Sequence, residues 1–374
     1  MSKWTKNKPY LKLFFWFFII IITFLVSIIP ILVIINNDKE IKKNNAKIKI
    51  VTTTTMLKDL VKHLLGDVDK DEPSSGEYQK IGDIQFESLM GVGVDPHNYR
   101  IVLSDRKKIK EADLVIFSGL HLEAKMPESL EKLSKKNFLK AEYILIHDKV
   151  VRKNDEGAED PHFWFDVELW KKVAKYFSEH LHEKLPSEGE PQKEENKKTI
   201  QKNYNIYSKK LVELNEYIEY KSNDLKNTLK VKPTLVTVHD AFAYFAQKYG
   251  FDIESIQGIS TQTEAGTANI KRIAKILQEK NIKAMFTETS MPKDALDALQ
   301  SQSQSLGYEI KVIKNNDGEL YSDSLGKEED ESEYIIDFTK KSNDLNKYSG
   351  KYKESTYIGA VLHNINLITE KLKN

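Results

Sequence analysis

Two Asp-Pro-His triplets occur in the sequence, at residues 95–97 and 160–162, in a chain that has nine histidines and ten prolines. Proline fixes its own φ angle and biases the preceding residue toward extended backbone. Each triplet should therefore place its histidine at the rigid start of a turn or helix. Because two imidazoles are presented in the same way, we expect them to share one chemical task.

A third histidine of interest, His239, ends the apolar segment "TLVTVH" and precedes a helical pattern. Ligands of open α/β sheets bind outside the carboxyl ends of the strands, which is where this side chain is expected. Imidazole suits borderline divalent ions such as zinc and also accepts manganese. Any one of His97, His162 and His239 alone would more often be structural, so the interpretation as metal ligands depends on the three together.

The remaining histidines are expected to have structural roles. They are His63, His121, His147, His180, His182 and His363. The first of them, His63, falls within an amphipathic helical pattern, where surface positions are the rule. His147 follows the apolar segment "YILI", which we interpret as a strand.

Length and composition restrict the class of protein. The 374 residues exceed what one ordinary hydrophobic core covers, so two domains are expected. The 57 basic and 56 acidic residues give a net charge of +1, which offers no electrostatic reason to expect a nucleic-acid partner. Cysteine is absent, which excludes disulfides, thiolate metal sites, a cysteine nucleophile and a lipid-modified cysteine anchor.

Residues 14–35 contain no charged side chain and predict a membrane-spanning helix. As a helix this segment rises roughly 33 Å, enough to cross a bilayer. No small-residue cleavage site follows it, so we interpret residues 1–36 as a cytoplasmic stub and an uncleaved anchor. Lysines before the segment favour a cytoplasmic N-terminus, which places the globular part outside the cell membrane. Residues 37–47 form a charged tether.

From residue 48 onward, short β-branched segments alternate with amphipathic helical patterns, which is typical of α/β folds with parallel sheets. We assign residues 48–190 to an N-terminal α/β lobe and 231–374 to a C-terminal one. Residues 186–200 look like a charged loop, and the helical pattern that follows is unusually long. We therefore assign residues 191–230 to a rigid connecting helix.

Eight motifs in order resemble the solute-binding proteins of zinc and manganese ABC transporters, the TroA-like cluster (cluster A-I). The motifs are "GVGVDPHNYR", "ADLVIFSGLHLEAKM", "DPHFWFDVELW", "VTVHDAFAYFAQKYG", "QGISTQTEAGTANI", "FTETS", "LYSDSLG" and "YIGAVLHNINLI". The resemblance covers about residues 48–374. It implies two α/β lobes joined by one long rigid helix in a C-clamp, with a metal ion buried between the lobes.

By matching motifs, the resemblance implies four metal ligands: His97 and His162 in the first lobe, and His239 and Asp323 in the second. Without the resemblance, Asp323 would be read as a loop aspartate that bonds to nearby backbone. Glu264 and Glu288 also match motifs and are expected to orient the ligands.

The implied function is capture of Zn2+ or Mn2+ as cargo by a monomer, followed by delivery to a membrane permease driven by a cytoplasmic ATPase. The histidine at position 239 favours zinc over manganese. Two features depart from the family pattern: the anchor at residues 14–35 and a charged insertion at 327–354, which follows Asp323 closely.

Two alternatives would use the same fold, and the first of them would use the same three histidines and Asp323. A metal-dependent hydrolase would need an open coordination position and a general base, and the sequence has no H-E-x-x-H motif. A surface adhesin is the other alternative, with the charged insertion as its contact region. Capture without catalysis is favoured over both.

Overall fold

The computed structural model describes residues 47–373 except 124–125, 136, 263–265 and 328–351. The predicted anchor, most of the tether and most of the charged insertion lie outside the described residues. None of the described helices has both the length and the apolar composition to cross a membrane. The chain divides after Lys47, and the unit Ile48–Asn374 contains all the elements that follow.

The first lobe is built on a four-stranded parallel sheet in the order β2-β1-β3-β4. Its strands are β1 (Ile48–Thr52), β2 (Ile84–Ser88), β3 (Leu114–Phe117) and β4 (Phe138–Lys140). The helices of this lobe are α2 (Thr55–Leu64), α3 (Leu103–Glu111), α4 (Pro127–Leu133) and α5 (Glu142–His147), with 3-10 turns at Ser75–Glu77 and Phe163–Phe165. Because the strands are parallel, their carboxyl ends meet at one edge of the sheet.

The second lobe contains two parallel strand pairs, β5-β6 and β7-β8. The strands are β5 (Thr234–His239), β6 (Asp252–Gln257), β7 (Ala284–Phe286) and β8 (Lys311–Ile313). The helices are α8 (Ala243–Tyr249), α9 (Thr267–Glu279) and α10 (Asp294–Ser305), and a 3-10 turn spans Asn315–Asp317. Every residue of β5 is buried, which explains why its sequence lacks a polar and apolar alternation.

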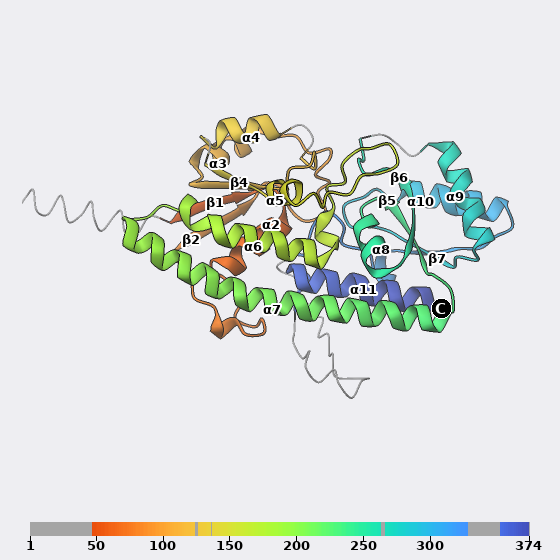
Figure 1. The fold of residues 1–374 in the computed structure, drawn as a ribbon. Coiled ribbons are helices and arrows are strands. Elements are labelled where there is room, and N and C mark those ends of the chain that lie inside the picture. Colours follow the sequence, from red (N-terminus) through yellow and green to blue (C-terminus); the bar gives the residue numbers. More distant parts are fainter. Residues whose placement is uncertain (1–46, 124–125, 136, 263–265, 328–351, 374) are drawn as a thin grey trace, which may run out of the picture. The chain divides into compact units, whose positions relative to one another are not determined.

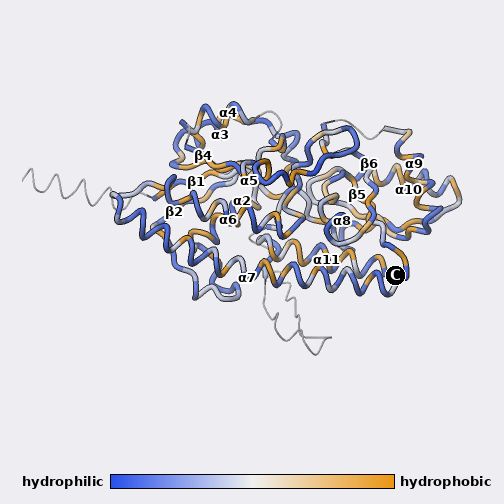
Figure 2. The backbone as a smooth tube through the Cα atoms, viewed as in Figure 1, coloured by the Kyte–Doolittle hydropathy of each residue, from blue (hydrophilic) through white to orange (hydrophobic). Residues whose placement is uncertain are grey.

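Three long helices run along the two lobes: α6 (Val167–Lys184), α7 (Glu190–Leu229) and α11 (Tyr357–Lys373). Helix α7 has 40 residues and is therefore roughly 60 Å long. It packs against α6 and α2 of the first lobe and against α8 of the second, and α11 lies beside it (Figure 1). Figure 2 shows mixed colours along these helices, as expected where one face of a helix is buried.

The structure corrects two predictions about local structure. The segment "YILI" at residues 143–146, predicted as a strand, lies in helix α5, because a short apolar segment does not distinguish a strand from one buried helix face. The segment 186–200, predicted as a loop, is helical from Glu190. Gly189, with φ of 130°, and Pro191 in the first turn mark the start of that helix, next to the assigned start of the connector at residue 191. The short strands β2 and β4 were not predicted.

One hydrophobic core extends across both lobes. It includes Ile50 of β1, Trp170 of α6, Tyr207 of α7, Leu235 of β5 and Tyr357 of α11. The Trp170 indole stacks on Tyr357 with ring centroids 4.8 Å apart and donates a 3.0 Å hydrogen bond to the Tyr207 hydroxyl. The two lobes therefore rest on a shared packed base, which restricts how far one can move against the other.

A buried ionic cluster lies beside this core. His63 Nε2 is 2.8 Å from Glu72 Oε1, which also accepts a 3.0 Å bond from Lys210 Nζ of α7. His63 Nδ1 is 2.9 Å from the carbonyl oxygen of Asp59. The side chain is 1% exposed and packs against the ring of Tyr207. The surface position expected for His63 is therefore wrong, because α7 covers this face of α2.

Titration of His63 makes the stability of the protein depend on pH. Burial opposes a charge on this imidazole, but the charges of Glu72 and Asp59 outweigh it and raise the pKa of His63 to about 8. A raised pKa contributes stability below the unfolded value near 6.5, and that stability is lost as pH rises through 8. We expect the free energy of unfolding to fall by about 2 kcal/mol more in wild type than in His63→Gln between pH 5.5 and 9.

Urea unfolding at several pH values measures this difference. His147→Gln is the control, because the imidazole of His147 is 82% exposed on α5. Equal pH dependence of wild type and His63→Gln would contradict the assignment.

Candidate metal centre

Four side chains that the sequence singled out come from four separate loops or strand ends. His97 lies in a turn after β2, and His162 directly precedes the 3-10 turn Phe163–Phe165. His239 is the last residue of β5, and Asp323 lies in the loop after the turn Asn315–Asp317. The first two belong to the first lobe and the other two to the second. The structure thus brings together residues that are up to 226 positions apart in the sequence.

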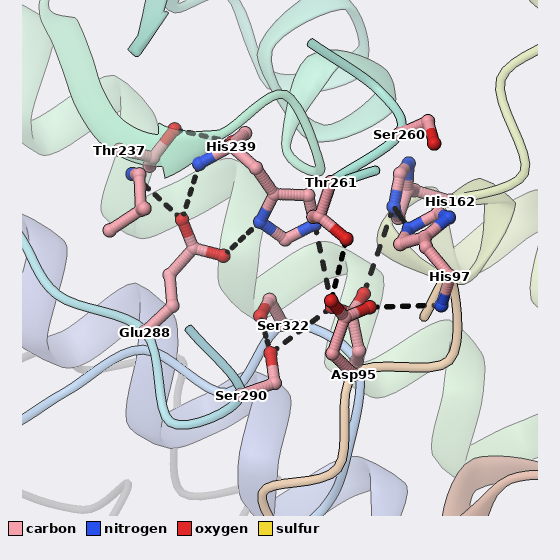
Figure 3. Close-up of polar contacts among 12 residues, drawn as sticks. Asp95, His97, His162, Thr237, His239, Ser260, Thr261, Glu288, Ser290 and Ser322 are labelled. Atoms are coloured by element: carbon pink, nitrogen blue, oxygen red, sulfur yellow. Dashed lines mark hydrogen bonds and ion pairs between the residues drawn. The ribbon is translucent and has the colours of Figure 1, made fainter. Parts of the chain in front are cut away.

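The four side chains converge on one point. One nitrogen or oxygen atom of each lies within 4.8 Å of the corresponding atoms of the other three. Nε2 of His162 is 3.2 Å from Nε2 of His97 and 3.7 Å from Oδ1 of Asp323. Nε2 of His239 is 3.4 Å from Oδ2 of Asp323. Figure 3 shows the three imidazoles turned toward one another, and none of the four residues is more than 2% exposed.

The two Asp-Pro-His triplets fold in the same way at the backbone. The amide of His97 donates a 2.9 Å bond to Asp95 Oδ1, and the amide of His162 donates a 3.0 Å bond to Asp160 Oδ1. Each aspartate thereby closes a local turn two residues long. This turn and the fixed φ of the proline hold each histidine at a rigid break in the chain, as the sequence predicted.

Two buried carboxylates orient two of the imidazoles. Oδ1 of Asp160 lies 2.8 Å from Nδ1 of His162, and Oδ2 of Asp160 accepts a 3.0 Å bond from Arg152. Oε2 of Glu288 lies 2.6 Å from Nδ1 of His239, while its Oε1 accepts bonds from the amides of Val238 and His239. A carboxylate on Nδ1 fixes the tautomer of a histidine and leaves Nε2 free for a metal.

The electrostatics of the cluster favour a positive charge at its centre. Burial lowers the pKa of His97 to about 4, against the charge of Asp323, and the neighbouring His162 and His239 lower it further. Burial also opposes a charge on His239, but the carboxylates of Glu288 and Asp323 raise its pKa well above the ordinary value. For Asp323, burial raises the pKa, and the charges of the histidines more than reverse this. A proton or a divalent cation at the centre would balance the negative charge of the buried carboxylates.

The donor set fits a divalent transition metal. Three imidazole nitrogens and one carboxylate are ligands that zinc accepts in tetrahedral sites. Oδ1 of Asp323 is buried and has no hydrogen-bond donor among the described residues, so it has an acceptor position left for an ion. Oδ2 of Asp323 accepts a 3.1 Å bond from Ser290, whose hydroxyl also contacts Ser322.

Sequence reasoning found the four converging residues and Glu288, but it missed Asp160. The repeated triplet was the signal for it, because both aspartates are part of the pattern that drew attention to the histidines. Ser290 is the last residue of the motif "FTETS" and was also missed, because nothing in a lone serine points to chemistry. The predicted orienting residue Glu264 lies outside the described residues.

The fold has two α/β lobes, and three histidines and one aspartate are buried where the lobes meet. These features are typical of proteins that bind a ligand, here a metal ion, between two lobes. The chain belongs to the family described as zinc-uptake complex component A, periplasmic, which matches residues 50–370. The resemblance seen in the eight motifs is thereby confirmed. Members of this family are metal-binding transport proteins.

Characterised relatives cover most of the chain. It is 31% identical over 328 residues to the zinc-binding protein TroA of Treponema pallidum, covering 88% of this chain and 90% of that protein. It is 30% identical over 329 residues to the manganese-binding lipoprotein MntA of Bacillus subtilis, covering 87% and 90%. The solved structure of periplasmic zinc binding protein TroA from Treponema pallidum matches with a TM-score of 0.69 at 31% identity, covering 87% of this chain and 99% of that one.

Asp160 should affect metal affinity without contacting the metal. Asp160→Asn keeps the shape of the side chain but removes the charge that orients His162. We expect zinc affinity to fall by roughly 10–100-fold, which is the usual cost of losing such an outer partner. Calorimetric titration of metal-stripped protein measures this.

Asp155→Asn is the matched control, because Asp155 is exposed in the preceding loop. An unchanged zinc affinity in Asp160→Asn would show that its carboxylate does not support the site.

Proposed function

We propose that this protein is an extracytoplasmic solute-binding protein that captures a divalent transition metal, zinc or manganese, between its lobes and delivers it to an ABC permease for import. The observation that carries the proposal is the convergence of three buried Nε2 atoms and one buried carboxylate from both lobes. The family and its zinc- and manganese-binding members support it. In this function the metal is cargo, so it has to be released as well as bound.

The proposed ligands are His97 and His162 from the first lobe and His239 and Asp323 from the second. Because each lobe supplies half of the donors, a bound ion would hold the lobes together. We assign residues 48–190 and 231–374 to these lobes and residues 191–230 to the connector. Glu288 serves as an orienting group for His239, and Glu264 is proposed in a similar role from its motif alone.

Zinc is proposed as the ion that binds more tightly in vitro. Three imidazoles form a borderline nitrogen-rich site, and zinc lies above manganese in the general order of affinities. The carboxylate of Asp323 is a hard oxygen donor that keeps manganese acceptable. The relatives include both a zinc-binding and a manganese-binding protein. The site is therefore expected to accept both ions.

Capture is favoured over catalysis at this site. A catalytic zinc site keeps an open position for water or substrate, and it has a general base beside it. Here all four converging donors come from the protein and none is more than 2% exposed. The proposed partners are a membrane permease and its cytoplasmic ATPase, and the protein is proposed to act as a monomer. No observation on the described residues favours the adhesin alternative.

The ligand assignment predicts the effect of four single substitutions. Replacing His97, His162, His239 or Asp323 by Ala removes one of four donors, so zinc affinity should fall by more than the roughly 10–100-fold cost of losing an outer partner. His147→Ala should leave affinity unchanged, because its side chain is 82% exposed on α5. Separate titrations of metal-stripped protein with zinc and with manganese measure both affinities.

Wild-type zinc affinity in His239→Ala would exclude that residue as a ligand. A higher affinity for manganese than for zinc in the wild type would reverse the proposed order of the two ions.

We propose that residues 14–35 keep the mature protein at the cell membrane with residues 36–374 outside, on the basis of the uncharged segment in the sequence. Protease treatment of intact cells should then remove the globular part and leave a small membrane-bound stub. A mature N-terminus beyond residue 35, mapped by mass spectrometry, would show that the segment is cleaved.

A further inference from the structure

The aspartate of the first triplet, Asp95, has a second contact that the aspartate of the other triplet lacks. Its Oδ1 accepts the amide of His97 within the first lobe. Its Oδ2 accepts a 2.5 Å bond from the Thr261 hydroxyl of the second lobe, and a 2.8 Å bond from Asn98. Figure 3 shows the hydroxyl of Thr261 turned toward Asp95. One carboxylate therefore joins the backbone of a proposed ligand to the opposite lobe.

Further bonds reinforce this crossing. Asn98 Nδ2 lies 2.9 Å from the Thr261 hydroxyl and 3.3 Å from its carbonyl oxygen. Gln262 donates a 3.1 Å bond to the carbonyl oxygen of His97. The peptide groups on both sides of His97 are thus held, one by Asp95 and the other by a residue of the second lobe.

The position of these residues suits a contact that opens. Thr261 is 8% exposed, Asp95 is half-buried and Asn98 is exposed, so the contact lies at the rim between solvent and the buried cluster. The 3.0 Å bond from the Trp164 indole to the carbonyl oxygen of Ser322 joins the lobes at a buried position, whereas the 2.9 Å bond from the amide of Gly93 to Ser324 Oγ is also only partly buried. A hydrogen bond to a carboxylate is stronger than a neutral one, but water can replace it once the rim separates.

We propose that Asp95 and Thr261 form a latch between the lobes, and that breaking this latch sets the rate at which captured metal leaves the site. The part of this inference that concerns metal release rests on the proposed function. The contact between the lobes does not depend on that function. Both are positioning residues: Asp95 acts through His97, and Thr261 acts through Asp95. Loss of the Thr261 hydroxyl should speed metal release more than it slows capture.

The first test measures zinc release from the full-length protein into an excess of a chromophoric chelator by stopped flow. Thr261→Val removes the donor and keeps the shape of the side chain, and we expect release roughly tenfold or more faster than in wild type. Thr261→Ser restores the hydroxyl and should release zinc as wild type does. Ser260→Ala is the matched control, because the described contacts of the Ser260 hydroxyl stay within its own loop.

The second test measures the distance between the lobes without any metal. The chain has no cysteine, so spin labels can be placed at Lys107→Cys on α3 and Lys275→Cys on α9, both exposed. Thr261→Val should shift the distance distribution toward longer values, and Thr261→Ser should not.

The outcomes separate the latch from the proposed function. Wild-type zinc release and wild-type distances in Thr261→Val overturn the latch, as does equally fast release in Thr261→Val and Thr261→Ser. If wild-type protein binds neither zinc nor manganese, the proposed function fails, and the distance measurement alone decides whether the latch holds the lobes. Unchanged distances in Thr261→Val would then overturn it.

Discussion

The burial of ionisable side chains at one point is the constraint on which the rest of the structure depends. His162, His239 and Asp160 are fully buried, and Glu288 and Asp323 nearly so. A buried charge is costly unless it is paired and hydrogen-bonded. Each of these groups has a partner, and the field that remains favours a cation where the Nε2 atoms meet. The surrounding strands, turns and helices hold these partners at fixed distances.

The packed core beneath the site limits how the two lobes can move at its rim. The core beneath it runs through α6, α7 and α11 and joins both lobes by packing, and the Trp170 indole bonds α6 to α7. Such a base favours small movements of the lobes over wide ones. If the four side chains bind an ion as proposed, a small movement of the lobes would be enough to remove two of its four donors. Release of cargo then depends on contacts at the rim.

How much the sequence predicts differs between the site and the elements around it. The proline-fixed triplets and the end of a buried strand are local features, so His97, His162 and His239 could be found from the sequence, and the family motifs added Asp323. Short elements were harder: β2, with the sequence "IQFES", is a half-exposed strand with a weak pattern, and "EYILIH" reads equally well as strand or helix. The burial of His63 could not be predicted, because it depends on α7, which lies far along the chain.

The two Asp-Pro-His triplets show why one sequence pattern does not imply one role. Both aspartates bond to the amide of the histidine two residues later, and this common part follows from local backbone geometry. Their remaining oxygens differ because their surroundings differ. Asp160 is fully buried and turns inward to the ring of its own histidine, whereas Asp95 is at the rim and reaches the opposite lobe. The same motif can therefore fix the geometry of the centre on one side and connect it to the movement of the lobes on the other.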